Sequence, residues 1–128
     1  MRVLLVEDTD AIQLVIEALL TKLGLHVDVA KNGRVAVERA TTESYDLIFM
    51  DGQLPELDGY EATRRIRKHE SLSNAPRQII IAMTADVMPG NRAAFLKAGM
   101  DDYVAKPISE SILSAILDRW LVRRCGRI

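Results

Sequence analysis

Four short apolar runs in this sequence each end in side chains that carry a charge or a hydroxyl group. Those side chains are, in chain order, Glu7 with Asp8, then Asp51, Thr84 and Lys106. An Asp such as Asp51 could simply begin a turn, which is a common role for this residue. If the runs are parallel strands, however, their carboxyl ends lie at one edge of a sheet, where ligands of such sheets bind. Three acids, a hydroxyl and a lysine at one edge therefore point to chemistry.

The chemistry follows from the charges. Three neighbouring carboxylates repel one another unless one is protonated or a cation lies among them. Mg²⁺ prefers oxygen ligands, and it is commonly held by one or two carboxylates together with phosphate. Asp carboxylates serve as nucleophiles in aspartyl-phosphate chemistry. The pattern predicts that Asp51 accepts a phosphoryl group, that Mg²⁺ and Lys106 stabilise the charge of that group, and that Thr84 donates a hydrogen bond to it.

The elements that would position these residues alternate strictly along the chain. Apolar or alternating runs predict strands at 2–6, 26–30, 45–50, 78–83 and 102–105. Helical spacing predicts helices at about 10–23, 33–43, 60–69, 89–99 and 108–121. Strands alternating with helices of this length favour an α/β fold with a five-stranded parallel sheet, doubly wound in a flavodoxin-like three-layer sandwich.

Two details of this prediction concern the helices. In the first helix the inward spacing i, i+3, i+4, i+7 is matched by Ile12, Val15, Ile16, Leu19 and Leu23. The stretch 71–76 is the most polar and least periodic part of the chain, so it is predicted to be a loop.

Composition excludes several classes of partner and location. A length of 128 residues suits one domain. Lys and Arg number 17 against 18 Asp and Glu, so a nucleic-acid partner is not indicated. No apolar stretch approaches the roughly 18–20 residues of a membrane span, and no signal peptide precedes the first run. The single cysteine, Cys125, permits no internal disulfide, which favours a cytoplasmic location.

The motifs around these residues resemble the receiver domain of two-component response regulators. They are Val6-Glu7-Asp8, Met50-Asp51-Gly52-Gln53-Leu54-Pro55, Asp58-Gly59, Thr84-Ala85 and Lys106-Pro107. The resemblance runs from Arg2 to about Leu121, and we expect a receiver domain at 1–124 with a short tail at 125–128. Five motifs in this order and spacing make the resemblance to this family specific.

The resemblance implies a role for each residue of the acidic group. Asp51 is the expected phosphoacceptor. Glu7 and Asp8 form the expected acidic pair around Mg²⁺, with Asp8 the direct ligand and the backbone carbonyl of Gln53 a third protein ligand. Many family members carry Asp at the position of Glu7, and both residue types occur there.

The resemblance also implies how the site changes state. Thr84 would bond the phosphoryl group, Lys106 would pair with it, and the Lys106–Pro107 peptide would be cis. Tyr103 matches an aromatic switch position, so movement of Thr84 would let Tyr103 rotate inward. Gln53 and Asp86 occupy positions that tune the lifetime of the phosphoryl group, and we expect them to influence the attacking water.

A partner histidine kinase or histidine phosphotransfer protein is the implied phosphodonor, because His26 and His69 lie outside the expected edge and lack ligand spacing. Such a domain is not a conventional enzyme but catalyses its own phosphorylation and dephosphorylation, and a phosphorylation-dependent dimer is a further expectation. The runs 58–67 and 117–121 are similar to receivers of hybrid sensor histidine kinases. The chain is then a stand-alone receiver or a piece of a longer protein.

Two other functions compete with this interpretation. A Mg²⁺-dependent phosphatase with an aspartyl nucleophile usually has a second Asp two residues after the first, where this chain has Gln53. The other alternative is a receiver-shaped binding module that is never phosphorylated. The presence of Asp8, Asp51, Thr84 and Lys106 together argues against that module.

Overall fold

Strands and helices alternate in the computed structural model, which describes residues 2–52, 54, 57–84 and 89–125. The strands are β1 (Arg2–Val6), β2 (His26–Ala30), β3 (Leu47–Asp51), β4 (Ile79–Thr84) and β5 (Asp102–Ala105). The helices are α1 (Asp10–Lys22), α2 (Gly33–Thr42), α3 (Gly59–Ser73), α4 (Pro89–Ala98) and α5 (Glu110–Cys125). The predicted alternation is therefore confirmed. Helix α5 reaches one residue into the stretch predicted as a tail.

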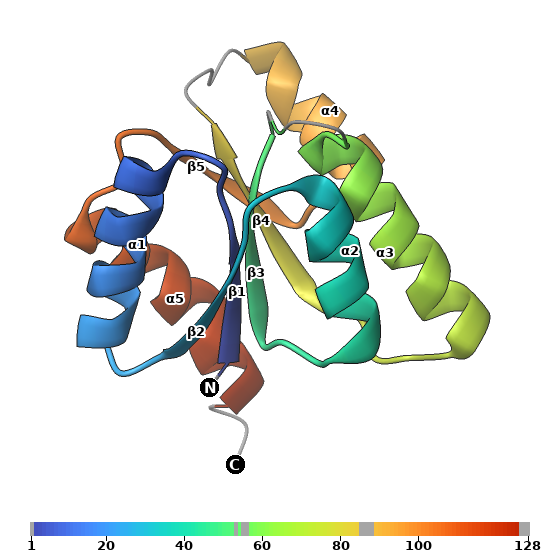
Figure 1. The fold of residues 1–128 in the computed structure, drawn as a ribbon, viewed down its shortest axis with the longest axis horizontal. Coiled ribbons are helices and arrows are strands. Elements are labelled where there is room, and N and C mark those ends of the chain that lie inside the picture. Colours follow the sequence, from blue (N-terminus) through green and yellow to red (C-terminus); the bar gives the residue numbers. More distant parts are fainter. Residues whose placement is uncertain (1, 53, 55–56, 85–88, 126–128) are drawn as a thin grey trace.

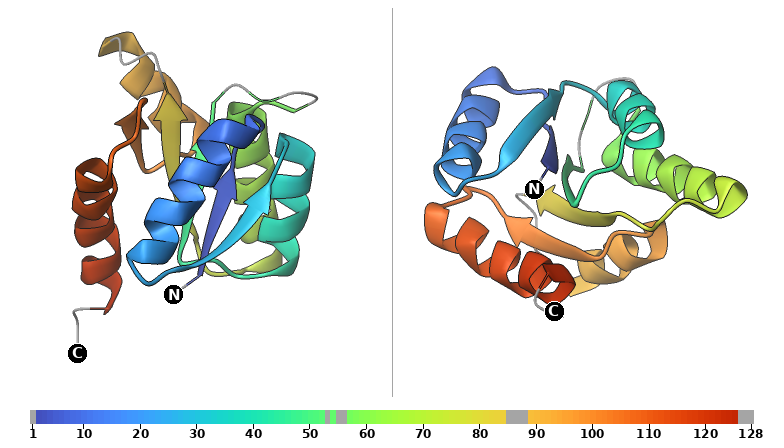
Figure 2. Two further views of the ribbon diagram at one scale, coloured as in Figure 1. Left: turned by 60° about the vertical axis from the view of Figure 1, so that its left-hand side comes forward. Right: turned by 90° about the horizontal axis from the view of Figure 1, so that it is seen from below.

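One parallel sheet holds all five strands in the order β2-β1-β3-β4-β5. Helices α1 and α5 cover one face of the sheet, and α2, α3 and α4 cover the other (Figure 2). This is the doubly wound three-layer arrangement that the alternation predicts. Because every strand runs in the same direction, the carboxyl ends of all strands lie at the upper edge in Figure 1.

Alternate residues of the central strands point into two separate cores. Ile48 and Met50 of β3 pack with residues of α2, α3 and α4, whereas Leu47 and Phe49 pack with residues of α1 and α5. All four side chains are fully buried. A strand buried on both faces reads as an unbroken apolar run, which is why the run before Asp51 shows no alternation.

The register aligns the strand ends that matter for the site. Val6 is the partner of Met50, Asp51 of Met83, and Thr84 of Ala105. The residues that follow β1, β3, β4 and β5 consequently meet at one edge. In the part of the chain that the structure describes, no helix is both long enough and apolar enough to cross a bilayer.

The predicted inward face of the first helix is wrong in part. The buried residues of α1 are Gln13, Ile16 and Leu20. Val15 is 56% exposed and Ile12 is 37% exposed, although both match helical spacing. The helix carries apolar side chains on more than one stripe, and spacing alone does not say which stripe meets the sheet.

The predicted end of the third helix is also wrong, because α3 continues through Ser73 into the stretch expected to be a loop. Glu70 is buried there and accepts a hydrogen bond of 2.8 Å from the backbone N–H of Gln78. Ser73 Oγ donates to the carbonyl of His69 at 2.6 Å. The helix ends at Asn74, which has φ 57° and donates its N–H to the Glu70 carbonyl. A contact with Gln78, just before β4, thus helps to hold as helix a segment that its own sequence marks as polar and aperiodic.

Candidate functional site

Three carboxylates gather at the carboxyl edge of the sheet. Glu7, Asp8 and Asp51 each offer an oxygen atom, and these atoms all lie within 4.8 Å of one another. Glu7 and Asp51 are buried, while Asp8 is exposed. The predicted convergence of these acids is therefore confirmed, and the exposed Asp8 leaves the group open to ions in solution.

Local backbone contacts hold the acids in place. The N–H of Glu7 donates to the carbonyl of Ala30 at 3.0 Å, which extends the β1–β2 pairing by one residue. Glu7 Oε2 accepts a hydrogen bond of 3.2 Å from the N–H of Thr9, just before α1. Asp51 is the last residue of β3 and remains paired in the sheet with Met83. Two rigid strand ends therefore fix the buried carboxylates.

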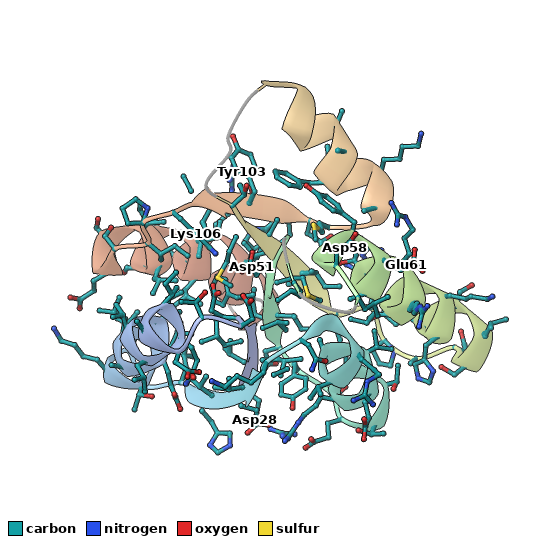
Figure 3. All side chains as sticks on the ribbon, turned by 45° about the horizontal axis from the view of Figure 1, so that its top comes forward. Asp28, Asp51, Asp58, Glu61, Tyr103 and Lys106 are labelled. Carbon is teal, nitrogen blue, oxygen red and sulfur yellow. The ribbon has the colours of Figure 1, made fainter. Side chains whose placement is uncertain are left out.

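Lys106 is the cation of the group. Its Nζ atom lies 3.1 Å from Glu7 Oε1 and 3.1 Å from Asp51 Oδ2. Figure 3 shows Lys106 and Asp51 pointing toward one another at this edge. The N–H of Lys106 donates to the Thr84 carbonyl at 2.7 Å, so β4 holds Lys106 beside the acids. The Lys106–Pro107 peptide is cis, as the resemblance implies.

The charges of the group do not balance. Burial lowers the pKa of Lys106, but its ion pairs with Glu7 and Asp51 outweigh burial and raise that pKa, so the ammonium group keeps its proton. Burial raises the pKa of Glu7, and the nearby charge of Asp51 adds to this, whereas the ion pair with Lys106 opposes it. One ammonium group thus faces three acids, which favours a second cation.

The chemistry of the oxygen atoms fits a hard divalent cation. Glu7 Oε1 is buried and lies close to Lys106 Nζ, yet it makes no hydrogen bond within the described part of the chain. A buried carboxylate oxygen without a hydrogen bond is costly unless another ligand satisfies it. Carboxylate oxygens with access to solvent are the ligands that Mg²⁺ prefers. Glu7, Asp8 and Asp51 could hold such an ion together.

The segment after Asp51 is held against the strand by close backbone packing. The N–H of Gly52 donates to the Met83 carbonyl, and the N–H of Gly59 donates to the Gly52 carbonyl, both at 3.3 Å. A Cβ atom on Gly59 would lie 2.2 Å from the Asp51 carbonyl oxygen, so only glycine lets α3 begin here. Asp58 caps α3 by accepting a hydrogen bond of 2.8 Å from the N–H of Glu61. The Asp58-Gly59 motif therefore serves the position of Asp51.

Gln53 and Asp86 lie outside the residues that the structure describes. Thr84 ends β4 with its side chain partly exposed, on the same face of the sheet as Tyr103, because Thr84 pairs with Ala105 and Ala82 with Tyr103. His26 starts β2 opposite Arg2, at the amino end of the sheet, and takes no part in the site.

The side chain of Tyr103 is half-buried and points away from Asp51 and Lys106 (Figure 3). Its ring centroid lies 5.6 Å from that of Phe95 in α4. Phe95 in turn stacks on Tyr60 of α3 at 5.8 Å, with an angle of 9° between the rings. Sequence reasoning missed Tyr60 and Phe95, since no motif or spacing connects them to Tyr103.

An apolar groove adjoins Lys106 on the α1 side. It has a volume of about 520 Å³ and is lined by the first turns of α1 and by the segment from Lys106 to Ile108. The exposed residues Ile12 and Val15 belong to it. Their exposure, which the helical pattern did not predict, places an apolar surface directly beside Lys106.

Known relatives are similar to this chain in sequence over nearly its whole length. Sensor histidine kinase GacS of Pseudomonas protegens is 41% identical over 119 residues, which are 93% of this chain and 13% of GacS. Two-component response regulator ORR41 of Oryza sativa subsp. japonica is 42% identical over 123 residues, 93% of each chain. The chain thus spans a small part of the kinase and nearly all of the response regulator.

Solved structures of receiver domains are also similar to this chain. The receiver domain of sensor histidine kinase PA1611 from Pseudomonas aeruginosa PAO1, with a magnesium ion coordinated in its active site cleft, has a TM-score of 0.84 and 48% identity. That comparison covers 94% of this chain and 96% of the other. The receiver domain of Ssk1, crystallised with the histidine phosphotransfer protein Ypd1 of Saccharomyces cerevisiae, has a TM-score of 0.90 and 33% identity over 96% of this chain and 90% of that one.

The family model described as response regulator receiver domain matches residues 3–118. The match covers the five strands except Arg2, helices α1 to α4, and the first nine residues of α5. The chain therefore belongs to the response regulator receiver domain family and is a receiver domain of two-component phosphorelay signalling.

Proposed function

We propose that Asp51 accepts a phosphoryl group from a partner's phosphohistidine and later loses it to water. The observation that supports this most directly is the position of Asp51, buried 3.1 Å from Lys106 Nζ and grouped with Glu7 and Asp8. A carboxylate that only began a turn would not need two further acids and a lysine around it. Perturbed, closely coupled acids and bases of this kind are typical of functional sites.

The transfer exchanges one bond to phosphorus for another. An oxygen of Asp51 forms a bond to phosphorus while the bond from phosphorus to the donor's imidazole nitrogen breaks, and that nitrogen keeps the electron pair. The product is an acyl phosphate. Lys106 pairs with the oxygens of the transferring group, and Thr84 donates a hydrogen bond to one of them.

Mg²⁺ is the proposed cofactor, held by Glu7, Asp8 and Asp51, with the backbone carbonyl of Gln53 as a further ligand. When bound, it would neutralise charge on the phosphoryl oxygens. The buried Glu7 Oε1 atom, which pairs with Lys106 but makes no hydrogen bond in the described part of the chain, and the exposed carboxylate of Asp8 support this assignment. The magnesium ion in the PA1611 receiver domain supports it independently.

The decisive experiment compares wild type with Asp51→Ala after incubation with Mg²⁺ and acetyl phosphate. Wild type should gain one acid-stable, hydroxylamine-labile adduct, and Asp51→Ala should gain none. Asp28→Asn, a change in β2 at a side chain bonded to Arg2 and Tyr45, is the control and should be labelled like wild type. Failure of wild type to gain an adduct, from acetyl phosphate or from phosphohistidine donors, would falsify the proposal. Continuous release of phosphate from small esters would instead indicate a phosphatase.

The apolar groove beside Lys106 is the proposed docking surface for the donor, a histidine kinase or histidine phosphotransfer protein. It borders the phosphorylation site and exposes Ile12 and Val15, so a donor helix placed there would bring its histidine to Asp51. Val15→Asp should slow transfer from a phosphorylated donor protein by about tenfold or more, given the weight of apolar anchors in interfaces. It should leave labelling by acetyl phosphate unchanged. Leu72→Asp, at a residue of α3 that is 78% exposed, is the matched control.

The proposed output is a change of surface around α4 and β5. Phosphorylation adds charge and acceptor oxygens, Thr84 moves toward them, and Tyr103 rotates into the space that Thr84 leaves. Thr84→Ala should therefore abolish the phosphorylation-dependent surface change, measured by amide hydrogen exchange. Asp86→Ala and Gln53→Ala should alter the dephosphorylation rate. An unchanged rate in both would remove them from the mechanism.

We further propose that residues 1–124 form the receiver domain and that it acts on the cytoplasmic side of the membrane. It would do so as part of a hybrid sensor histidine kinase or as a separate regulator. The identity to GacS supports the first origin and the identity to ORR41 the second. A phosphorylation-dependent dimer remains a prediction, which sedimentation of the phosphorylated domain would test.

A further inference from the structure

Three aromatic rings from separate elements form a stack beside the site, in which the Tyr60 and Phe95 rings are 9° from parallel and the Phe95 and Tyr103 rings are tilted by 36°. Tyr60 lies in the first turn of α3, Phe95 in α4 and Tyr103 in β5. Phe95 is the middle ring, 5.8 Å from Tyr60 and 5.6 Å from Tyr103. Phe95 is only 2% exposed, so its ring is surrounded by other side chains and is out of contact with solvent. The middle ring is therefore fixed, while Tyr103 at the end of the stack is half-buried.

The other end of the stack reaches the segment that follows Asp51. The ring of Tyr60 covers Gly52, because a Cβ atom built on Gly52 would lie 3.8 Å from Tyr60 Cε2 and 3.9 Å from the Tyr60 hydroxyl oxygen. Tyr60 directly follows Gly59, whose backbone packs against the Asp51 carbonyl. The position of Phe95 is thus tied to the backbone beside the phosphoacceptor.

Tyr103 cannot keep this contact and also move inward. The register places Thr84 and Tyr103 on one face of the sheet, with Tyr103 in the row next to Thr84. In the present conformation the Tyr103 ring points away from Asp51 and contacts Phe95 (Figure 3). Rotation toward Thr84 would take the ring away from Phe95. Contacts between aromatic rings favour specific geometries, so this one stabilises the outward conformation.

We propose that Phe95 is a brake on the Tyr103 switch. By holding the outward Tyr103 ring, it keeps most unphosphorylated molecules in the conformation that suits the phosphoryl group least. This inference rests on the proposed switching role of Tyr103. It adds a positioning residue that touches neither metal nor phosphoryl group and acts only through Tyr103.

The brake has a measurable consequence for affinity. If the receptive conformation is a minor fraction of the population, the apparent dissociation constant of any phosphoryl analogue rises as that fraction falls. Removing the Phe95 ring should therefore tighten binding of beryllofluoride with Mg²⁺ by about two- to tenfold, the range that an aromatic pair contact represents. A purely structural role for Phe95 would leave affinity unchanged or weaken it.

The test measures beryllofluoride affinity in the presence of Mg²⁺ for wild type, Phe95→Leu and Phe95→Met. Both variants keep an apolar side chain in the core and remove the ring, so one remains informative if the other folds poorly. Leu96→Ala changes the neighbouring residue of α4, which is 53% exposed, and should match wild type. In a Tyr103→Leu background, Phe95→Leu should have no further effect, because the contact it removes is already absent.

A second measurement follows Tyr103 directly. Fluorotyrosine incorporation gives three ¹⁹F signals, for Tyr45, Tyr60 and Tyr103. Without ligand, the Tyr103 signal of Phe95→Leu should shift toward the position that wild type reaches with beryllofluoride. Unchanged or weaker affinity in both Phe95 variants, or an undiminished effect in the Tyr103→Leu background, would overturn the brake. If wild type itself neither binds beryllofluoride nor becomes phosphorylated, the proposed function fails as well, and the two failures are thereby distinguished.

Discussion

The two ends of the sheet carry the same kinds of side chain in different balance. At the carboxyl end, Glu7, Asp8 and Asp51 lie close together, and within the described residues Lys106 forms ion pairs with Glu7 and Asp51. At the amino end, acids are matched by cations or hydroxyl groups. Asp28, for example, accepts hydrogen bonds from Arg2 at 3.0 Å and from the Tyr45 hydroxyl at 2.8 Å.

A second cluster at the amino end shows the same matching. Arg67 is largely buried and donates to Glu70 at 2.9 Å, to Asp101 at 2.8 Å, and to the carbonyls of Gln78 and Gly99 at 2.6 and 2.9 Å. This cluster joins α3, β4 and the start of β5. Ionic groups with complete sets of partners fix the fold, whereas the unbalanced acids at the other end form the proposed site for a cation and a phosphoryl group.

The largest loss of stability should come from removing Arg67 at the amino end of the sheet, which we call the matched end because its acids have cation or hydroxyl partners. Arg67→Met removes the guanidinium that the buried Glu70 carboxylate shares with the partly buried Asp101 carboxylate, and only Asp101 keeps a second partner, Arg77. Loss of one partner of a buried pair costs about 3–5 kcal/mol of the free energy of unfolding. Urea unfolding would measure this loss.

The control for this change is Arg64→Met on the same helix. Arg64 is 56% exposed, and its pair with Glu61 should contribute under about 1 kcal/mol. Labelling of the folded Arg67→Met protein by acetyl phosphate should still occur, because the cluster lies at the opposite end from Asp51. Equal losses of stability in the two variants would contradict the structural role given to Arg67.

Asp→Asn changes should have smaller effects, which differ between the two ends of the sheet: Mg²⁺ affinity should fall at one end and stability at the other. Asp8→Asn should weaken Mg²⁺ binding by about tenfold, or about 1.4 kcal/mol, because a charged oxygen ligand is lost. It should not lower the stability of the metal-free protein, since it relieves repulsion among acids. Calorimetric titration with Mg²⁺ and urea unfolding measure the two quantities.

Asp28→Asn is the matched control for Asp8→Asn. It should lower stability, because the partners of Asp28 lose a charged acceptor, and it should leave Mg²⁺ affinity as in wild type. If Asp28→Asn weakens Mg²⁺ binding as much as Asp8→Asn does, the separation of the two ends is wrong.

The smallest effect should come from Tyr45→Phe at the amino end. The phenol is buried and bonded to Asp28, and both raise the pKa of Tyr45. Loss of its hydrogen bond should cost about 1 kcal/mol near neutral pH. Because the folded pKa lies above the unfolded value of about 10, this contribution is complete below pH 10 and is lost as pH rises further.

The alkaline range therefore provides the measurement for Tyr45. Wild type should lose stability above pH 10 more steeply than Tyr45→Phe, since only wild type releases the Tyr45 proton on unfolding. Urea midpoints of the two proteins should converge as pH rises. Parallel curves would show that Tyr45 ionises equally in both states and would remove it from the matched end.

The gathering of Glu7, Asp8, Asp51 and Lys106 could be predicted from the sequence, because parallel strands bring their carboxyl ends together whatever the helices do. Their residue types then indicated the chemistry. Side chains that act through tertiary contact could not be found in this way. Arg67 reads as one charge among several on α3, and its burial depends on Asp101, which is distant in the chain. Phe95 reads as core.

The errors in the helices have the same origin. The exposed position of Val15 and the helical state of 71–73 are decided by what α1 and α3 pack against. Helical spacing and polarity describe a segment alone, so they do not contain this information.

The division of β3 between two cores restricts how this segment can evolve. Ile48 and Met50 serve one core and Leu47 and Phe49 the other, while Asp51 ends the same strand. Exchange of one apolar residue for another changes only local packing. Insertion or deletion of a single residue would exchange the two sets of side chains and displace the carboxylate at the strand end. Natural variation of β3 should therefore consist of substitutions at constant length.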